Sequence, residues 1–131
     1  MRLRRICAIG AAAIMLTVGV AAADPLPTQL GQCSSTTIKD VMTRLQDGAT
    51  KEPIPGSGSA VDFANGGYQV SYDTIAAITQ SRAGDPVTMC LVSLPTGCPP
   101  GDNRGITYKT TNLRTRGTWT LPDAEHMCGG A

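Results

Sequence analysis

This sequence has little of what an enzyme's active site needs. Its 131 residues include a single histidine, His126, and no Gly-x-Ser-x-Gly or Ser-x-x-Lys motif, so any Ser-His-Asp or other acid–base mechanism would depend on that one imidazole. No Cys-x-x-Cys pair is present, and the spacing of Asp123, Glu125 and His126 on a short tail does not bring all three onto one metal ion. We therefore predict no catalytic residues, no metal site and no cofactor.

The first 23 residues have the composition of a signal peptide. Three arginines lie within the first five positions, an apolar run follows over residues 6–20, and Ala21–Ala23 supplies the small residues that a signal peptidase requires before Asp24. The alternative is an uncleaved membrane anchor, but the run is short for a spanning helix and is interrupted by two glycines and a threonine. We predict a leader over 1–23 and a single periplasmic or secreted domain over 24–131, with no stable membrane insertion after cleavage.

The mature chain lacks a strong charge of either sign. The leader carries three of the eleven Lys and Arg residues, so eight basic residues remain against ten acidic ones. The resulting formal charge of −2 argues against a broad nucleic-acid-binding or anionic-membrane-binding surface.

Aromatic side chains are scarce, since the chain has one Phe, three Tyr and one Trp. So few large rings make a modest core, to which disulfides would add stability. Four cysteines follow the leader, Cys33, Cys90, Cys98 and Cys128, and an exported chain would pair them. Of the three possible pairings we favour Cys90 with Cys98, because a turn at Pro95–Gly97 would bring them together, and this leaves Cys33 for Cys128.

Residues 87–104 form the stretch around which we expect the fold to be organised. Apolar residues on both faces of 87–94 predict a strand buried between two layers, and Pro95 ends it. Pro99–Asn103 follows, with two prolines and a glycine that favour a stiff exposed loop.

Two hairpins are expected on either side of this strand. In Ser59–Asp73, alternating apolar residues flank Asn65-Gly66, and a two-residue turn there would set Phe63 opposite Tyr68. The second hairpin covers 106–121, has its turn near Gly117 and ends at Pro122.

Other segments leave alternatives open. Residues 36–47 have helical apolar spacing but many β-branched residues, so both helix and strand remain; for 75–82 we favour a strand over a helix. Residues 24–32 are expected to be a flexible lead-in and 49–59 a loop. Together these patterns predict a mainly β fold: a small, disulfide-stapled antiparallel barrel or sandwich, with one short N-terminal helix if 36–47 is helical.

Four stretches in the second half resemble a group of small, uncharacterised exported bacterial proteins: Cys98–Asp102, Thr110–Thr115, Trp119–Asp123 and His126–Gly130. This resemblance covers most of the mature chain and implies export but no activity. In size, bridges and β content the chain is also similar to the periplasmic lysozyme-inhibitor barrels, whose inhibitory loop has a Ser-Gly-x-x-Tyr pattern. Here Ser57-Gly58-Ser59-Ala60 is followed by Val61.

We predict a non-enzymatic binding domain whose partner is a protein or a cell-envelope component. The first candidate surface is Pro99–Arg104, with Asp102, Asn103 and Arg104 as binding residues, and the second is Pro53–Gly58. The alternatives are a lysozyme-inhibitor-like protein, a small hydrolase or metal-dependent enzyme centred on His126, and an envelope protein with a structural role.

Overall fold

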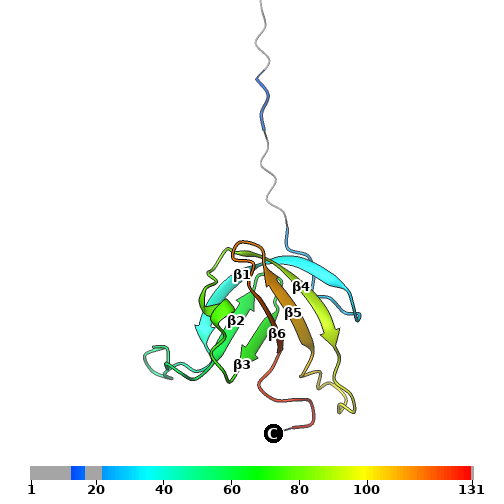
Figure 1. The fold of residues 1–131 in the computed structure, drawn as a ribbon. Coiled ribbons are helices and arrows are strands. Elements are labelled where there is room, and N and C mark those ends of the chain that lie inside the picture. The colour runs from blue at the N-terminus through cyan, green and yellow to red at the C-terminus, as the bar shows by residue number, and fades with distance from the viewer. Residues whose placement is uncertain (1–12, 17–21, 131) are drawn as a thin grey trace, which may run out of the picture.

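The computed structural model describes residues 13–16 and 22–130 and shows a mainly β domain, as predicted. Six antiparallel strands form one sheet in the order β3-β2-β1-β4-β5-β6, which curls into a half-barrel (Figure 1). Most of the predicted signal peptide lies outside the described residues, and none of the helices within them is long or apolar enough to cross a membrane. The elements are β1 (Cys33–Thr43), β2 (Ser59–Phe63), β3 (Tyr68–Ser71), α1 (Ala76–Thr79), β4 (Pro86–Ser93), β5 (Thr107–Asn112) and β6 (Thr118–Pro122).

Strand β1 joins the two halves of the sheet and resolves the ambiguity over 36–47 in favour of a strand. Cys33–Thr37 pairs with β4, whereas Asp40–Thr43 pairs with β2. A bulge that follows Ile38 bends the strand between these two parts. The bulge also explains the helix-like spacing, because one extra residue lets both Ile38 and Val41 face the core although they are three positions apart. No N-terminal helix is therefore formed by this segment.

Strands β2 and β3 form the predicted hairpin, but the predicted register was wrong by one residue. The amide of Phe63 donates to the carbonyl oxygen of Gly67 at 2.9 Å, which closes a loop one residue longer than the expected turn. Tyr68 therefore faces Asp62 and not Phe63. Because side chains alternate along a strand, this shift places Gln69 in the core and leaves Tyr68 half-buried on the other face. The second predicted hairpin is present as β5 and β6.

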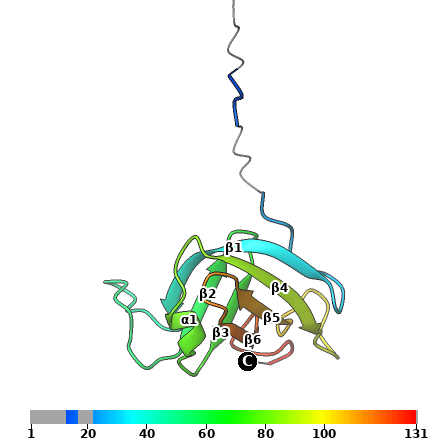
Figure 2. The same ribbon diagram turned by 45° about the horizontal axis from the view of Figure 1, so that its top comes forward.

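The prediction of a strand over 75–82 was wrong, because this segment contains α1. The amide of Gly84 donates to the carbonyl oxygen of Ile38 at 2.8 Å, so the turn before β4 lies against β1. The preceding residues are thus free to coil inward, and Ile78 is 1% exposed within the core. Contacts of α1 with β2 and β6 place it over one end of the half-barrel interior (Figure 2).

Strand β4 buries one face, which corrects the prediction of a strand between two layers. Val87, Met89 and Leu91 lie in the core, whereas Val92 and Leu94 are exposed. The curled sheet packs its concave face on itself, and within residues 13–16 and 22–130 no second layer of strands or helices covers the other side of β4.

Gln69 links the two edges of the sheet, β3 and β6, which have no backbone pairing. Its Nε2 donates to the carbonyl oxygens of Tyr108 and Leu121 at 2.7 and 2.9 Å. Its Oε1 accepts from the Thr110 hydroxyl at 2.6 Å and from the Trp119 indole nitrogen at 2.8 Å. All the hydrogen-bonding capacity of this buried amide is thereby used to close the seam, the line along which the edge strands β3 and β6 meet.

All four cysteines are bridged, but the favoured pairing was wrong. Cys33 is bonded to Cys90, and Cys98 is bonded to Cys128. The ladder of β1 with β4 sets Cys33 directly opposite Cys90, and after Pro95 the chain leads away from β4 toward the C-terminal tail. Two disulfides indicate an oxidising environment.

Residues 24–32 are held against β1 and are not a free lead-in, contrary to our expectation. The amide of Asp24 donates to the carbonyl oxygen of Ser35 at 2.9 Å, and the amide of Ser35 donates to the Asp24 carboxylate at 3.0 Å. Leu26 packs against the core. This segment therefore covers the edge of β1 that faces away from β4.

Candidate functional site

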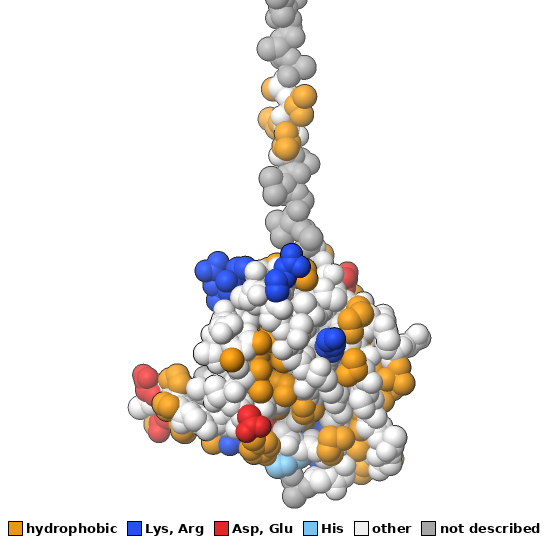
Figure 3. Space-filling view, viewed as in Figure 1, with side chains coloured by type: hydrophobic (Ala, Val, Ile, Leu, Met, Phe, Trp, Pro, Cys, Tyr) orange, Lys and Arg blue, Asp and Glu red, His pale blue; other side chains and the backbone are white. Residues whose placement is uncertain are grey.

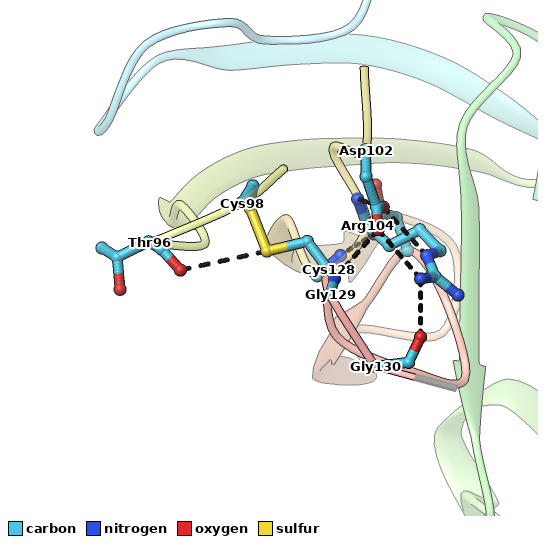
Figure 4. The surroundings of a disulfide bond; sticks show 9 residues. Thr96, Cys98, Asp102, Arg104, Cys128, Gly129 and Gly130 are labelled. Carbon is cyan, nitrogen blue, oxygen red and sulfur yellow. Dashed lines mark hydrogen bonds and ion pairs between the residues drawn. A yellow bond between two sulfur atoms is a disulfide. The ribbon is translucent and has the colours of Figure 1, made fainter. Parts of the chain in front are cut away.

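The predicted binding residues Asp102 and Arg104 bind each other (Figure 4). Nε and Nη2 of Arg104 each donate to a different carboxylate oxygen of Asp102, at 2.9 Å. Nη2 also donates to the carbonyl oxygen of Gly130 at 3.0 Å, and the amide of Gly129 donates to Asp102 at 2.9 Å. The hydrogen bonds from Arg104 hold the pKa of the Asp102 carboxyl well below its usual range. The pair thus fastens the C-terminal tail beside the second disulfide.

Asn103, the third predicted binding residue, is exposed between these two. A ligand of Asp102 or Arg104 would first have to replace bonds within the chain. The Pro99–Arg104 loop therefore has the geometry of a structural clamp, and binding by its three polar residues stays a prediction.

His126, the pale blue side chain in Figure 3, is exposed on the tail. The neighbouring carboxylates are directed at different partners: Glu125 pairs with Arg44 at 3.4 Å, and Asp123 accepts from the amide of Gly105 at 2.8 Å. Within residues 13–16 and 22–130, no group of three or more His, Cys, Asp or Glu side chains is placed to hold a metal ion.

The second predicted surface, Pro53–Gly58, belongs to a loop that projects from the half-barrel (Figures 1 and 2). The loop has its own main-chain hydrogen bonds: the amide of Asp47 donates to Glu52 at 2.9 Å, and the amide of Ile54 donates to Leu45 at 3.1 Å. Residues 51–56 are exposed. The loop is therefore an ordered projection whose side chains are available to a partner.

A hollow of about 430 Å³ lies between this loop, the end of β1 and α1. Its size is within the range of small-ligand pockets. Its lining includes Ile78 and Thr79 of α1 and Met42 and Thr43 of β1. Figure 2 shows α1 beside the end of β1, with the projecting loop next to them.

Arg44 fastens the projecting loop to the end of β1, although its own side chain does not line the hollow. Its guanidinium carbon lies 4.3 Å from the centroid of the Tyr72 ring, a cation–π contact. Its Nε donates to the carbonyl oxygen of Ser57 at 2.7 Å, and its Nη1 pairs with Glu125. One side chain therefore ties the loop and the tail to the end of β1, which holds the base of the projecting loop in place.

A buried polar cluster around Asp85 was not predicted from the sequence. The Asp85 side chain is 3% exposed and accepts from the guanidinium of Arg114, from Asn112 Nδ2 at 2.8 Å and from the amide of Arg82 at 3.0 Å. Hydrogen bonds from Arg114 hold the pKa of this carboxyl well below its usual range, against the opposing effect of burial. Because the partners come from the turn before β4 and from the end of the β5–β6 hairpin, the cluster fastens these two turns together. No local motif marks it.

Comparison with known protein families, curated proteins and solved structures finds no match to this chain. The functional argument therefore depends on the geometry of the chain itself. Of the two predicted surfaces, one is closed by bonds within the chain and the other borders a hollow.

Proposed function

We propose that this chain is an exported, non-enzymatic binding domain that holds a protein partner at the hollow beside the projecting loop. The observation that carries the proposal is the hollow itself, bordered by an ordered, exposed loop on a scaffold with two disulfides. Binding sites in proteins are usually concave and largely preformed, and binding residues concentrate on loops that a rigid scaffold positions.

The hollow is favoured over the Pro99–Arg104 loop because of where the polar groups point. Asp102 and Arg104 are bonded to each other and to the tail, whereas residues 51–56 are free to meet a partner. The formal charge of −2 after leader removal favours a protein over a nucleic acid as the partner.

A bait experiment with two matched variants tests this proposal. The full-length gene is expressed in a bacterial host that exports the product, and the purified protein is offered to periplasmic and secreted extracts, peptidoglycan and lysozyme. Thr79→Tyr places a bulky ring in the hollow, and Asn103→Tyr places the same ring on the other candidate loop. We expect a saturable partner that Asn103→Tyr retains and Thr79→Tyr loses. The reverse pattern would favour the Pro99–Arg104 loop, and the absence of any saturable partner for the unmodified protein would overturn the proposal.

A further inference from the structure

One edge of β1 is unpaired where it borders the hollow. The amide of Arg44 donates to the carbonyl oxygen of Gly58 at 3.0 Å, which sets the phase of the ladder between β1 and β2. Because main-chain groups alternate between the two sides of a strand, the N–H and C=O groups of Val41 and Thr43 point away from β2, on the side of the hollow that these residues line. Strand β4 does not reach them, since it pairs with β1 only as far as Thr37.

No hydrogen bond from the part of the chain that the structure describes reaches these four main-chain groups. In the other half of β1, the edge that is not paired with a strand is covered: Asp24 bonds to Ser35 along the edge that faces away from β4. Edge strands with free N–H and C=O groups are templates for the addition of another strand. The edge at Val41 and Thr43 thus offers a partner two donors and two acceptors at strand spacing.

We infer that the partner protein adds an extended segment antiparallel to β1 at Val41–Thr43. This inference rests on the proposed function and specifies how the hollow is used. Three partner residues cover the stretch at about 3.4 Å per residue. The two outer ones face Val41 and Thr43, exchange main-chain hydrogen bonds with them, and place their side chains toward Ile78 and Thr79 of α1. The limited volume between β1 and α1 favours small apolar side chains at these two positions.

The charge on the outer face of β1 specifies the middle residue of the added segment. Asp40 and Asp62 are directly opposite each other in the β1–β2 ladder, and neither forms an ion pair with another described residue. Like charges in opposite positions disfavour each other. The middle partner residue, opposite Met42, lies diagonal to Asp40, within reach of a long side chain. Arg44, the other diagonal neighbour, already has Glu125 as its counter-charge. A Lys or Arg in the middle position therefore offsets the two carboxylates, and the preferred segment alternates small apolar, basic, small apolar.

A defined peptide tests this mode of binding. The acetylated and amidated peptide Thr-Val-Lys-Val-Thr is titrated to millimolar concentration into the ¹⁵N-labelled exported protein. We expect the amide signals of Val41 and Thr43 to shift and their hydrogen exchange to slow. Methylation of the valine amide nitrogens of the peptide removes its donors, and should weaken binding about tenfold or more. Exchange of the peptide lysine for aspartate should also weaken it.

Two protein variants provide the matched comparison. Thr43→Pro removes an N–H that points away from β2, so the β1–β2 ladder is kept, as it is where proline occurs on an edge strand. The affinity of this variant for the peptide should fall about tenfold or more. Thr43→Val keeps the N–H and the shape of the side chain, and should bind like the unmodified protein. Equal binding of the methylated and unmethylated peptides, or no shift at Val41 and Thr43, would overturn the inference.

Binding measurements with the natural partner distinguish this inference from the proposed function. A saturable partner that Thr43→Pro, with an unchanged circular dichroism spectrum, retains at full affinity would overturn strand addition and leave the binding function standing. A dimer of the unmodified protein that dissociates in Thr43→Pro would place a second copy on this edge, and would likewise overturn the assignment to a partner protein.

Discussion

Replacement of Gln69 by leucine tests how the half-barrel is closed. The substitution keeps a similar volume in the core but removes the amide that joins β3 to β5 and β6. The carbonyl oxygens of Tyr108 and Leu121 keep their partners in the β5–β6 ladder, in which these two residues face each other. The Thr110 hydroxyl and the Trp119 indole N–H lose their acceptor, because both donate to the Gln69 oxygen.

The cost of this substitution follows from the two orphaned donors. A buried donor without a partner costs about 1–3 kcal/mol, so two of them lower the free energy of unfolding by about 4 kcal/mol. That is a large share of the roughly 5–15 kcal/mol that keeps a typical domain folded. For a urea dependence of about 2 kcal/mol per molar, the unfolding midpoint should fall by about 2 M.

Urea unfolding followed by far-ultraviolet circular dichroism measures this loss, and a double-mutant cycle assigns it. Trp119→Phe removes one orphaned donor, so it should cost about 1–2 kcal/mol less in the Gln69→Leu background than in the unmodified protein. A midpoint shift below about 0.5 M for Gln69→Leu, or additive effects in the cycle, would refute the claim that Gln69 holds the seam.

Three further predictions concern other supports of the fold. The pKa of Asp85 is held below its ordinary value of 3.8, so its bonds stabilise the fold fully above that value and less as the pH falls from about 4 toward the folded-state pKa. Asp85→Asn should therefore be less stable at pH 7 and lose less of its stability in acid. Identical pH profiles of the two proteins in urea titrations would contradict this. Gly58 has a φ of 113°, and an added Cβ would collide with the main chain of β3, so Gly58→Ala should lower the free energy of unfolding in urea by about 3 kcal/mol. The control Gly56→Ala, where the space is open, should lower it by about 1 kcal/mol. Equal losses for the two variants would show that the collision is relieved. Joint replacement of Cys98 and Cys128 by serine opens a bridge with a sequence separation of 30 and should lower the free energy of unfolding by about 4 kcal/mol in the chain-entropy model. The amides of the tail should also lose their protection from hydrogen exchange. Unchanged protection would mean that the hydrogen bonds of the tail hold it in place without the disulfide.

Several features of this protein could be predicted from local sequence patterns. The mainly β class and the two hairpins follow from alternating apolar residues and from turn residues such as Asn65 and Gly117, which act over a few positions. The bridged state of all four cysteines followed from their even number behind an apolar leader. The projecting loop followed from the glycines and prolines of 53–58. Each of these inferences needed only neighbours in the chain.

The candidate site could be predicted only in part, for a physical reason. Pro53–Gly58 was recognised as a loop, but the hollow beside it exists because the bulge after Ile38 bends β1 away from β4 and because α1 turns inward. The sequence cannot show that the side chains of Asp102 and Arg104 are already bonded to each other and to the tail.

The sequence by itself determined the class of fold, the location of its turns and the residues that are cross-linked, because short-range backbone preferences and composition decide these. Only the tertiary structure decided the cysteine pairing, the one-residue register that buries Gln69, and the unpaired edge at Val41. The pairing of Cys33 with Cys90 depends on the ladder between β1 and β4, and the Gln69 bonds join residues 39 to 52 positions apart. Contacts between such distant residues are set by how the whole sheet curls and packs, and no local pattern encodes them.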